Sequence, residues 1–148
     1  MSLVISLDDG INIDDLLIKK LNKIVSIILE QEMVSECEIN LRLMNDIEMQ
    51  KLNMQFRQKN KTTNVLSFPN DDVSVKQTKN IGDIAISVEY VKAEAEKEGK
   101  TFDDHIIHML AHGVYHILGY DHENEENAMI MENKEIQILK KINIGNPY

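Results

Sequence analysis

An apolar segment late in the chain carries histidines at regular spacing. Residues 105–118 read HIIHMLAHGVYHIL, and apart from the histidines nearly every side chain is apolar. A helix that is hydrophobic all round is buried in the core rather than amphipathic at the surface. Because buried polar groups need partners, the pattern predicts a core helix whose imidazoles bind something inside the protein.

The spacing of the histidines indicates a metal site. His112 and His116 are four residues apart, so they lie on one helical face, one turn apart. His122 would point elsewhere if the helix continued, so the chain must leave the helix and turn back. Gly119 stands where that turn has to start, and glycine accepts the positive φ of a helix C-terminus without steric cost. We therefore expect His112, His116 and His122 to hold one metal ion.

Three imidazoles leave a coordination position open. This is the catalytic pattern for zinc, because structural zinc sites are closed by four ligands. We expect one Zn²⁺ per chain, acting in hydrolysis. The alternative is a set of histidines satisfied by hydrogen bonds alone, but it leaves the combination of Gly119 and His122 unexplained. His108, one turn before His112, could line the pocket or orient a ligand, but a packed, hydrogen-bonded core histidine is favoured. No role is expected for His105.

The ligand spacing equals that of the metzincin proteases, HExxHxxGxxH, whose glutamate is the general base. In this chain Gly113 occupies the position of that glutamate. A glycine inside a helix costs about 1 kcal/mol relative to alanine, so Gly113 is expected to leave room for close packing or for a substrate. Without the glutamate, a peptidase is not favoured.

Charge is distributed unevenly along the chain. The formal net charge is −9, which by itself argues against a nucleic-acid-binding protein. Residues 50–70, however, contain Lys51, Arg57, Lys59 and Lys61 and no acidic residue. This segment is either an ordinary solvated loop or a place where phosphates bind.

Length and composition fit one cytoplasmic domain over residues 1–148. No apolar run approaches the roughly 20 residues of a membrane helix, and Met1–Leu7 does not resemble a secretory signal. Cys37 is the only cysteine, so it has no partner for an internal disulfide, and a reducing compartment is expected. No membrane partner is expected.

Hydrophobic periodicity predicts an α+β fold. The expected strands are 3–7, 37–43, 65–68 and 81–88, and the expected helices are 14–31, 45–56, 88–98, 105–118 and 125–142, with a polar loop at 70–80. Because strands come early and helices late, we expect a small mixed sheet of about four strands packed with helices. The expected core residues of three helices are Leu17, Leu21, Ile24 and Ile28; Ile47, Leu52 and Phe56; and Met129, Ile136 and Leu139.

Four segments resemble a known family. HGVYHILGYDH (112–122) resembles the HGxLHLxGYDH signature of the bacterial YbeY endoribonucleases, zinc-dependent rRNA maturation factors. FRQKNKTTNVLSFP (56–69), IGDIAIS (81–87) and MENKEIQIL (131–139) are similar to that family's arginine-containing segment, GDI strand and closing helix. The resemblance covers most of the chain, and Tyr115 and Ile117 replace the usual leucines of the signature.

The resemblance implies a zincin-like domain and particular site residues. His112, His116 and His122 would be the zinc ligands, and Arg57 would be the family's functionally important arginine. A guanidinium can hold a phosphate through two hydrogen bonds, so Arg57 would stabilise charge that develops during cleavage. Lys59 and Lys61 are candidate contacts to the RNA backbone.

The implied function is a single-strand-specific, zinc-dependent endoribonuclease that processes the 3′ end of 16S rRNA and acts in ribosome quality control. Its partners would be ribosomal RNA and the small ribosomal subunit or associated factors, with no DNA. The general base is unassigned: Asp121 is one candidate, although a turn-forming or ligand-supporting role is favoured for it, and Asp83 is a weaker one. The alternatives are a zinc hydrolase of peptides or small molecules, and a ribosome assembly factor with a mainly structural zinc.

Overall fold

The computed structural model describes residues 2–70 and 79–148. These residues form the strands β1 (Leu3–Leu7), β2 (Glu38–Met44), β3 (Val65–Pro69) and β4 (Asn80–Ser87), and the helices α1 (Asp15–Gln31), α2 (Asp46–Arg57), α4 (Val88–Glu98), α5 (Phe102–Ile117) and α6 (Glu125–Lys140). All the elements expected from the sequence are present, with small shifts at their ends. Most of the expected loop at 70–80 lies outside the described residues. Within the described ranges, no helix is long and apolar enough to cross a membrane.

The strands form one mixed sheet in the order β1-β2-β4-β3. β2 pairs in parallel with β1 and with β4, whereas β3 pairs antiparallel with β4. The expectation of a small mixed sheet of four strands is therefore confirmed. β3 is an edge strand, and Pro69 lies at its last paired position, which is a place where a sheet tolerates proline.

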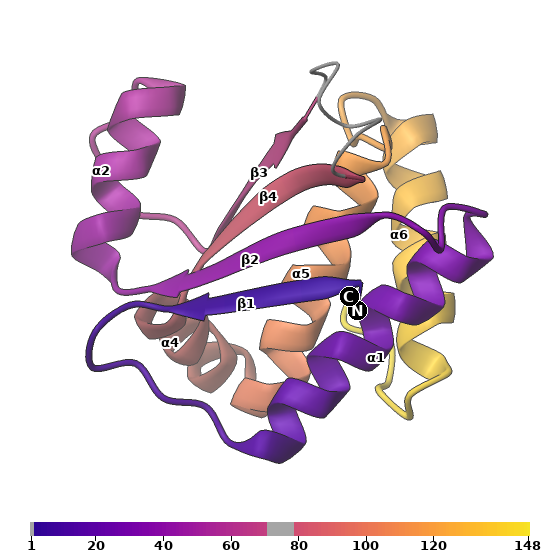
Figure 1. The fold of residues 1–148 in the computed structure, drawn as a ribbon, viewed down its shortest axis with the longest axis horizontal. Coiled ribbons are helices and arrows are strands. Elements are labelled where there is room, and N and C mark those ends of the chain that lie inside the picture. The colour runs from indigo at the N-terminus through magenta and orange to yellow at the C-terminus, as the bar shows by residue number, and fades with distance from the viewer. Residues whose placement is uncertain (1, 71–78) are drawn as a thin grey trace.

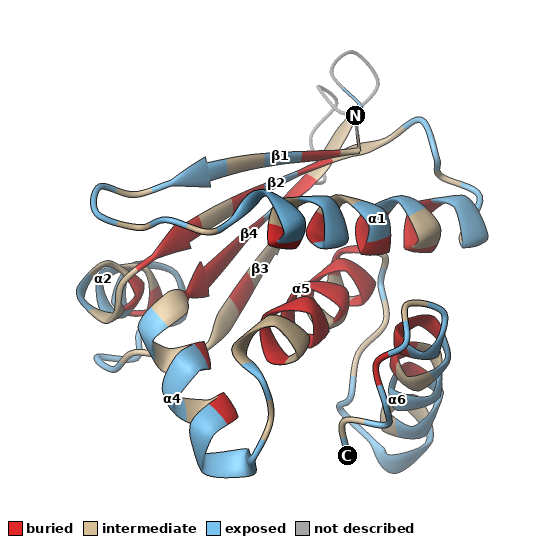
Figure 2. Cartoon of the chain, turned by 90° about the horizontal axis from the view of Figure 1, so that it is seen from below, coloured by how far each residue is buried: buried red, intermediate tan, exposed pale blue. Residues whose placement is uncertain are grey.

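Helix α5 runs through the centre of the molecule (Figures 1 and 2). It contacts β3 and β4 on one side and α1, α4 and α6 on the others, so nearly all of its circumference is covered. This explains why its sequence is apolar all round. The principal core joins α5 to the strands through Ile39, Leu41, Leu43, Ile84 and Ile86 and to α1 through Leu17, Leu21, Ile24 and Ile28.

The opposite face of the sheet is covered in part by α2. Its Met49 is buried with Met44, Leu66 and Ala85, and Leu52 packs against this cluster. The prediction that Ile47 and Phe56 also face the core is wrong, since they are 66% and 51% exposed. A single helix against one part of a sheet face buries only a narrow stripe, and these two side chains lie outside it.

Helix α6 packs against α5 through a stripe that differs in part from the predicted one. Met131, Glu135, Ile138 and Leu139 are its buried residues, whereas the predicted Met129 is 63% exposed. The sequence-based choice followed apolar residues only. The true register places a glutamate, Glu135, at a position with no solvent exposure.

Gly113 brings α5 close to the sheet. A Cβ atom added there would lie 3.0 Å from Oγ of Ser67 and 3.1 Å from Cδ1 of Ile84. The expectation of close packing is therefore confirmed, and the same contacts leave no space for a glutamate side chain. Substituting Gly113→Val is expected to lower the free energy of unfolding by about 1–3 kcal/mol, because overpacking forces neighbours apart.

Urea denaturation of the metal-free protein measures this change. Gly145→Val is the matched control, because a Cβ added at Gly145 has no neighbouring atom within 4 Å. Equal stability of the two variants would show that α5 can move away from β3 and β4 without cost.

Candidate active site

The three histidines of the motif lie together at the end of α5. Each of His112, His116 and His122 offers a ring nitrogen, and these nitrogens lie within 4.8 Å of one another. His112 and His116 are half-buried and His122 is exposed. The arrangement is a cluster with one open side, as a catalytic metal site requires.

A helix-ending turn brings His122 back to the other two. Gly119 has a φ of 100°, and its N–H donates to the carbonyl of His116 while the N–H of Tyr120 donates to that of Tyr115. This pair of bonds is a Schellman motif, in which glycine is favoured. The Tyr120 hydroxyl donates to the Glu32 carboxylate at 3.1 Å, which anchors the turn to the end of α1.

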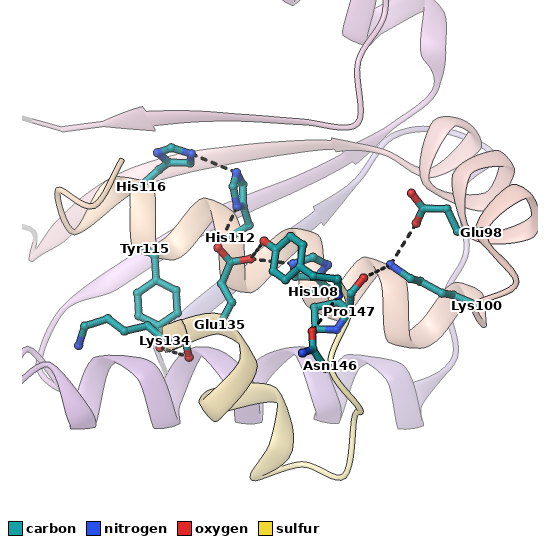
Figure 3. Close-up of polar contacts among 11 residues, drawn as sticks. Glu98, Lys100, His108, His112, Tyr115, His116, Lys134, Glu135, Asn146 and Pro147 are labelled. Atoms are coloured by element: carbon teal, nitrogen blue, oxygen red, sulfur yellow. Dashed lines mark hydrogen bonds and ion pairs between the residues drawn. The ribbon is translucent and has the colours of Figure 1, made fainter. Parts of the chain in front are cut away.

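A buried carboxylate from α6 orients His112 (Figure 3). One oxygen of Glu135 lies 3.1 Å from Nδ1 of His112, and the other lies 2.7 Å from Nε2 of His108. His108 is thus a packed, hydrogen-bonded core histidine, as expected. Metal-binding histidines commonly donate their second nitrogen to such a partner, which fixes the ring and its tautomer.

Glu135 is ionised despite its complete burial. Burial alone would raise its pKa, but hydrogen bonds from His108, His112 and Tyr148 outweigh that effect and hold the pKa at about 2. An ionised carboxylate can only accept hydrogen bonds. Nδ1 of His112 is therefore a donor, and in the neutral ring Nε2 carries a lone pair.

His116 has the same tautomer for a different reason. Its Nδ1 lies 3.0 Å from the backbone carbonyl of Tyr120, which can only accept. Burial lowers the pKa of His116, and neighbouring His112 and His122 lower it further, against the effect of the Tyr120 carbonyl. The neutral ring, which is the form that binds metals, is therefore favoured.

The two Nε2 atoms thus present lone pairs to each other at 3.1 Å. Two acceptors at this distance repel each other unless a cation lies between them. Ligands at 2.0–2.1 Å from a tetrahedral zinc ion are roughly 3.3 Å apart, so the observed separation fits such an ion. The donor set, the tautomers and the spacing all suit a divalent metal.

Arg57 opens onto the same pocket as the histidines. A cavity of about 490 Å³ is lined by residues from the end of α2, from β3 and from the motif: Arg57, Asn64, Val65, Leu66, Ser67, Pro69, His112, His116 and His122. Arg57 is the last residue of α2 and is exposed. The fold therefore joins two segments that lie far apart in the sequence.

The Arg57 side chain is held in place along β3. Its Nη2 donates to the carbonyl of Ser67 at 3.0 Å, and its guanidinium carbon lies 5.2 Å from the centre of the Phe68 ring. Phe56 packs edge-on against the same ring. A guanidinium has five N–H donors, so donors are left for an anion in the pocket.

The other candidates do not share this pocket. Lys59 and Lys61 are exposed and are not among its lining residues. Asp83 accepts from Asn40 on the sheet face away from α5, which removes it as a general base. Asp121 accepts from the N–H of Glu123 and from the amide of Asn127, so it has the turn-forming role that was favoured.

Sequence reasoning missed three contributors: Glu135, the Tyr120 carbonyl and Tyr148. Glu135 left a signal, since it lies four residues after Met131 and three before Ile138, on one helical face. An acidic residue within an apolar stripe indicates a buried charge with a partner. The Tyr120 carbonyl leaves no such signal, because any residue type supplies one.

Comparison with known proteins identifies the family. The family profile described as Endoribonuclease YbeY matches residues 5–143. The chain belongs to the YbeY family. A YbeY protein from Bartonella bacilliformis is 48% identical over 113 residues, which make up 75% of this chain and 72% of that protein. The YbeY protein from Francisella tularensis subsp. novicida is 37% identical over 133 residues, or 85% of this chain and 80% of that protein.

A solved structure shares the fold. A protein from Thermotoga maritima, determined in solution, superposes with a TM-score of 0.68 at 27% identity, over 95% of this chain and 88% of that one. The relatives from Bartonella and Francisella are both named endoribonuclease YbeY. These matches agree with the family resemblance of the histidine motif.

Proposed function

We propose that this YbeY protein is a metal-dependent endoribonuclease that cleaves single-stranded RNA in the maturation of ribosomal RNA. The observation that carries the proposal is the shared pocket of Arg57 and the three histidines. A phosphate bound there would face a permanent positive charge on one side and the metal position on the other. The family name supports the same reaction.

Each group of the pocket has a role in this proposal. A divalent ion held by His112, His116 and His122 would supply a Lewis acid to the scissile phosphate. Glu135 and the Tyr120 carbonyl accept from Nδ1 of His112 and of His116, so that in the neutral rings the lone pair lies on Nε2, facing the metal position. Arg57, fixed against Ser67 and Phe68, donates to phosphate oxygens and stabilises the charge that develops on them.

Finer parts of the proposal rest on the sequence motifs. The metal is Zn²⁺, one per chain, and residues 1–148 form one zincin-like domain with α5 as the metal-bearing helix. The protein acts in the cytoplasm on the 3′ end of 16S rRNA and in ribosome quality control, with the small ribosomal subunit or its associated factors as partners. Lys59 and Lys61 would contact RNA outside the pocket, where phosphate contacts position a strand without reading its sequence.

The test compares single-stranded and duplex forms of one ribosomal RNA fragment. We expect zinc-loaded protein to cleave the single strand at least about tenfold faster, because opening one base-pair step costs roughly 1.4 kcal/mol. Cleavage is followed by gel electrophoresis of end-labelled RNA. A peptide library is the matched control: peptide hydrolysis with intact RNA would assign the pocket to a hydrolase of another class.

A further inference from the structure

The segment after α6 runs back toward α5 and reaches His108 and Glu135, on the side of the histidine cluster away from the Arg57 pocket. Lys100 donates to the Pro147 carbonyl at 2.7 Å, which fixes this segment beside the start of α5. The Tyr148 ring then packs edge-on against His108, with ring centres 5.4 Å apart. Its hydroxyl donates to Oε1 of Glu135 at 2.8 Å. A residue 26 positions after the last histidine of the motif thereby contacts the group that orients a ligand.

We propose that Tyr148 is a positioning residue for the metal centre, acting on His112 through Glu135. This inference rests on the proposed metal-dependent function of the pocket. Glu135 receives three hydrogen bonds: Tyr148 and His108 donate to Oε1, and His112 donates to Oε2. The first two hold the carboxylate in one orientation, and that orientation presents Oε2 to Nδ1 of His112.

Because Glu135 is buried, a water molecule cannot easily take the place of the Tyr148 hydroxyl. Glu135 has no solvent exposure, although Tyr148 itself lies at the surface and lines a second pocket of about 270 Å³ with His108 and His112. Glu135 is not among the residues that line this pocket. The Tyr148 hydroxyl therefore supplies the hydrogen bond that solvent would otherwise have to provide, and it does so in one fixed direction.

Partners of a metal ligand commonly change metal affinity by about 10- to 100-fold when they are lost. Tyr148 acts one step further away, so we expect Tyr148→Phe to weaken zinc binding by roughly tenfold. The phenylalanine keeps the ring contact with His108 and removes only the hydroxyl. Tyr148 as a whole is 59% exposed, but its hydroxyl bonds a buried carboxylate, so the metal-free variant should stay folded and melt only a few degrees below the wild type.

The experiment measures zinc affinity by competition with a chelator and the melting temperature of the metal-free protein. Tyr90→Phe is the matched control: within the described residues, no hydrogen bond involves the Tyr90 hydroxyl, and the residue lies on α4 outside both pockets. Equal zinc affinity of Tyr148→Phe and Tyr90→Phe would overturn the proposal. A weaker affinity accompanied by unfolding of the metal-free Tyr148→Phe protein would also overturn it, because the role would then be structural.

A His116→Ala protein measured in parallel separates this inference from the function on which it rests. If His116→Ala binds zinc as tightly as the wild type, the metal centre itself is absent and both proposals fail. If His116→Ala loses zinc and Tyr148→Phe does not, only the positioning role fails. The expected result is that His116→Ala and Tyr148→Phe both bind zinc more weakly than the wild type, while both metal-free proteins remain folded.

Discussion

Substituting His116→Ala is expected to remove metal binding from the site and to reduce RNA cleavage to background. Zinc sites with four ligands bind with about 10–16 kcal/mol, or about 2.5–4 kcal/mol for each ligand. Losing one of three histidines should therefore weaken zinc affinity by roughly 100- to 1000-fold. His116 is the ligand to choose, because its Nε2 faces that of His112 at 3.1 Å.

Zinc content after dialysis and single-turnover cleavage of single-stranded ribosomal RNA measure the effect. His105→Gln is the matched control, since His105 is another histidine of α5 that lies outside the pocket and pairs with Glu94 at 2.8 Å. Glutamine can keep a hydrogen bond to Glu94. Full cleavage by His116→Ala would mean that the activity comes from a contaminating nuclease or from another site.

The Arg57→Ala variant should keep its metal and lose most of its catalytic rate. Removing one preorganised donor to a developing negative charge typically costs 10²–10³-fold in kcat, or about 3–4 kcal/mol. Arg57 meets the condition of preorganisation, because the Ser67 carbonyl and the Phe68 ring hold its guanidinium at the pocket wall. Single-turnover cleavage at saturating RNA, together with zinc analysis, separates the rate from RNA and metal binding.

Two further variants sharpen this prediction. Arg57→Lys keeps the charge but loses the planar fork, so its rate should fall between those of the wild type and Arg57→Ala. Lys51→Ala removes a positive charge from the same helix outside the pocket, where Lys51 pairs with Glu48 at 3.1 Å, and it should cleave like the wild type. Equal losses in Arg57→Ala and Lys51→Ala would replace the specific role with general electrostatic attraction.

The histidine cluster could be predicted from the sequence because its geometry is local. Spacing along one helix, followed by a glycine at the turn, fixes where His112, His116 and His122 can lie. The strand and helix periods also predicted the elements well. The position of Arg57 beside the histidines depends instead on the packing of β3 against α5. Periodicity could not predict this packing, and only the resemblance to the family indicated that Arg57 belongs to the site.

The groups that hold the histidines in place, above all Glu135, were harder to predict from the sequence. The register of α6 was judged from its apolar residues, and Glu135 was overlooked because glutamate is rarely buried. Only the fold reveals that His108, His112 and Tyr148 surround it and make its burial favourable. Ile47 and Phe56 were misplaced for a related reason: a helix period gives the apolar face, but not how much of that face its neighbours cover.

The order in which the pocket's parts occur along the chain has a consequence for biosynthesis. Arg57 and β3 are made first, the three histidines of α5 and its following turn come next, and Glu135 on α6 and then Tyr148 come later. A nascent chain that stops before α6 carries all three histidines but lacks the carboxylate that orients His112. The proposed pocket therefore takes its final form only after α6 has been made and has packed against α5.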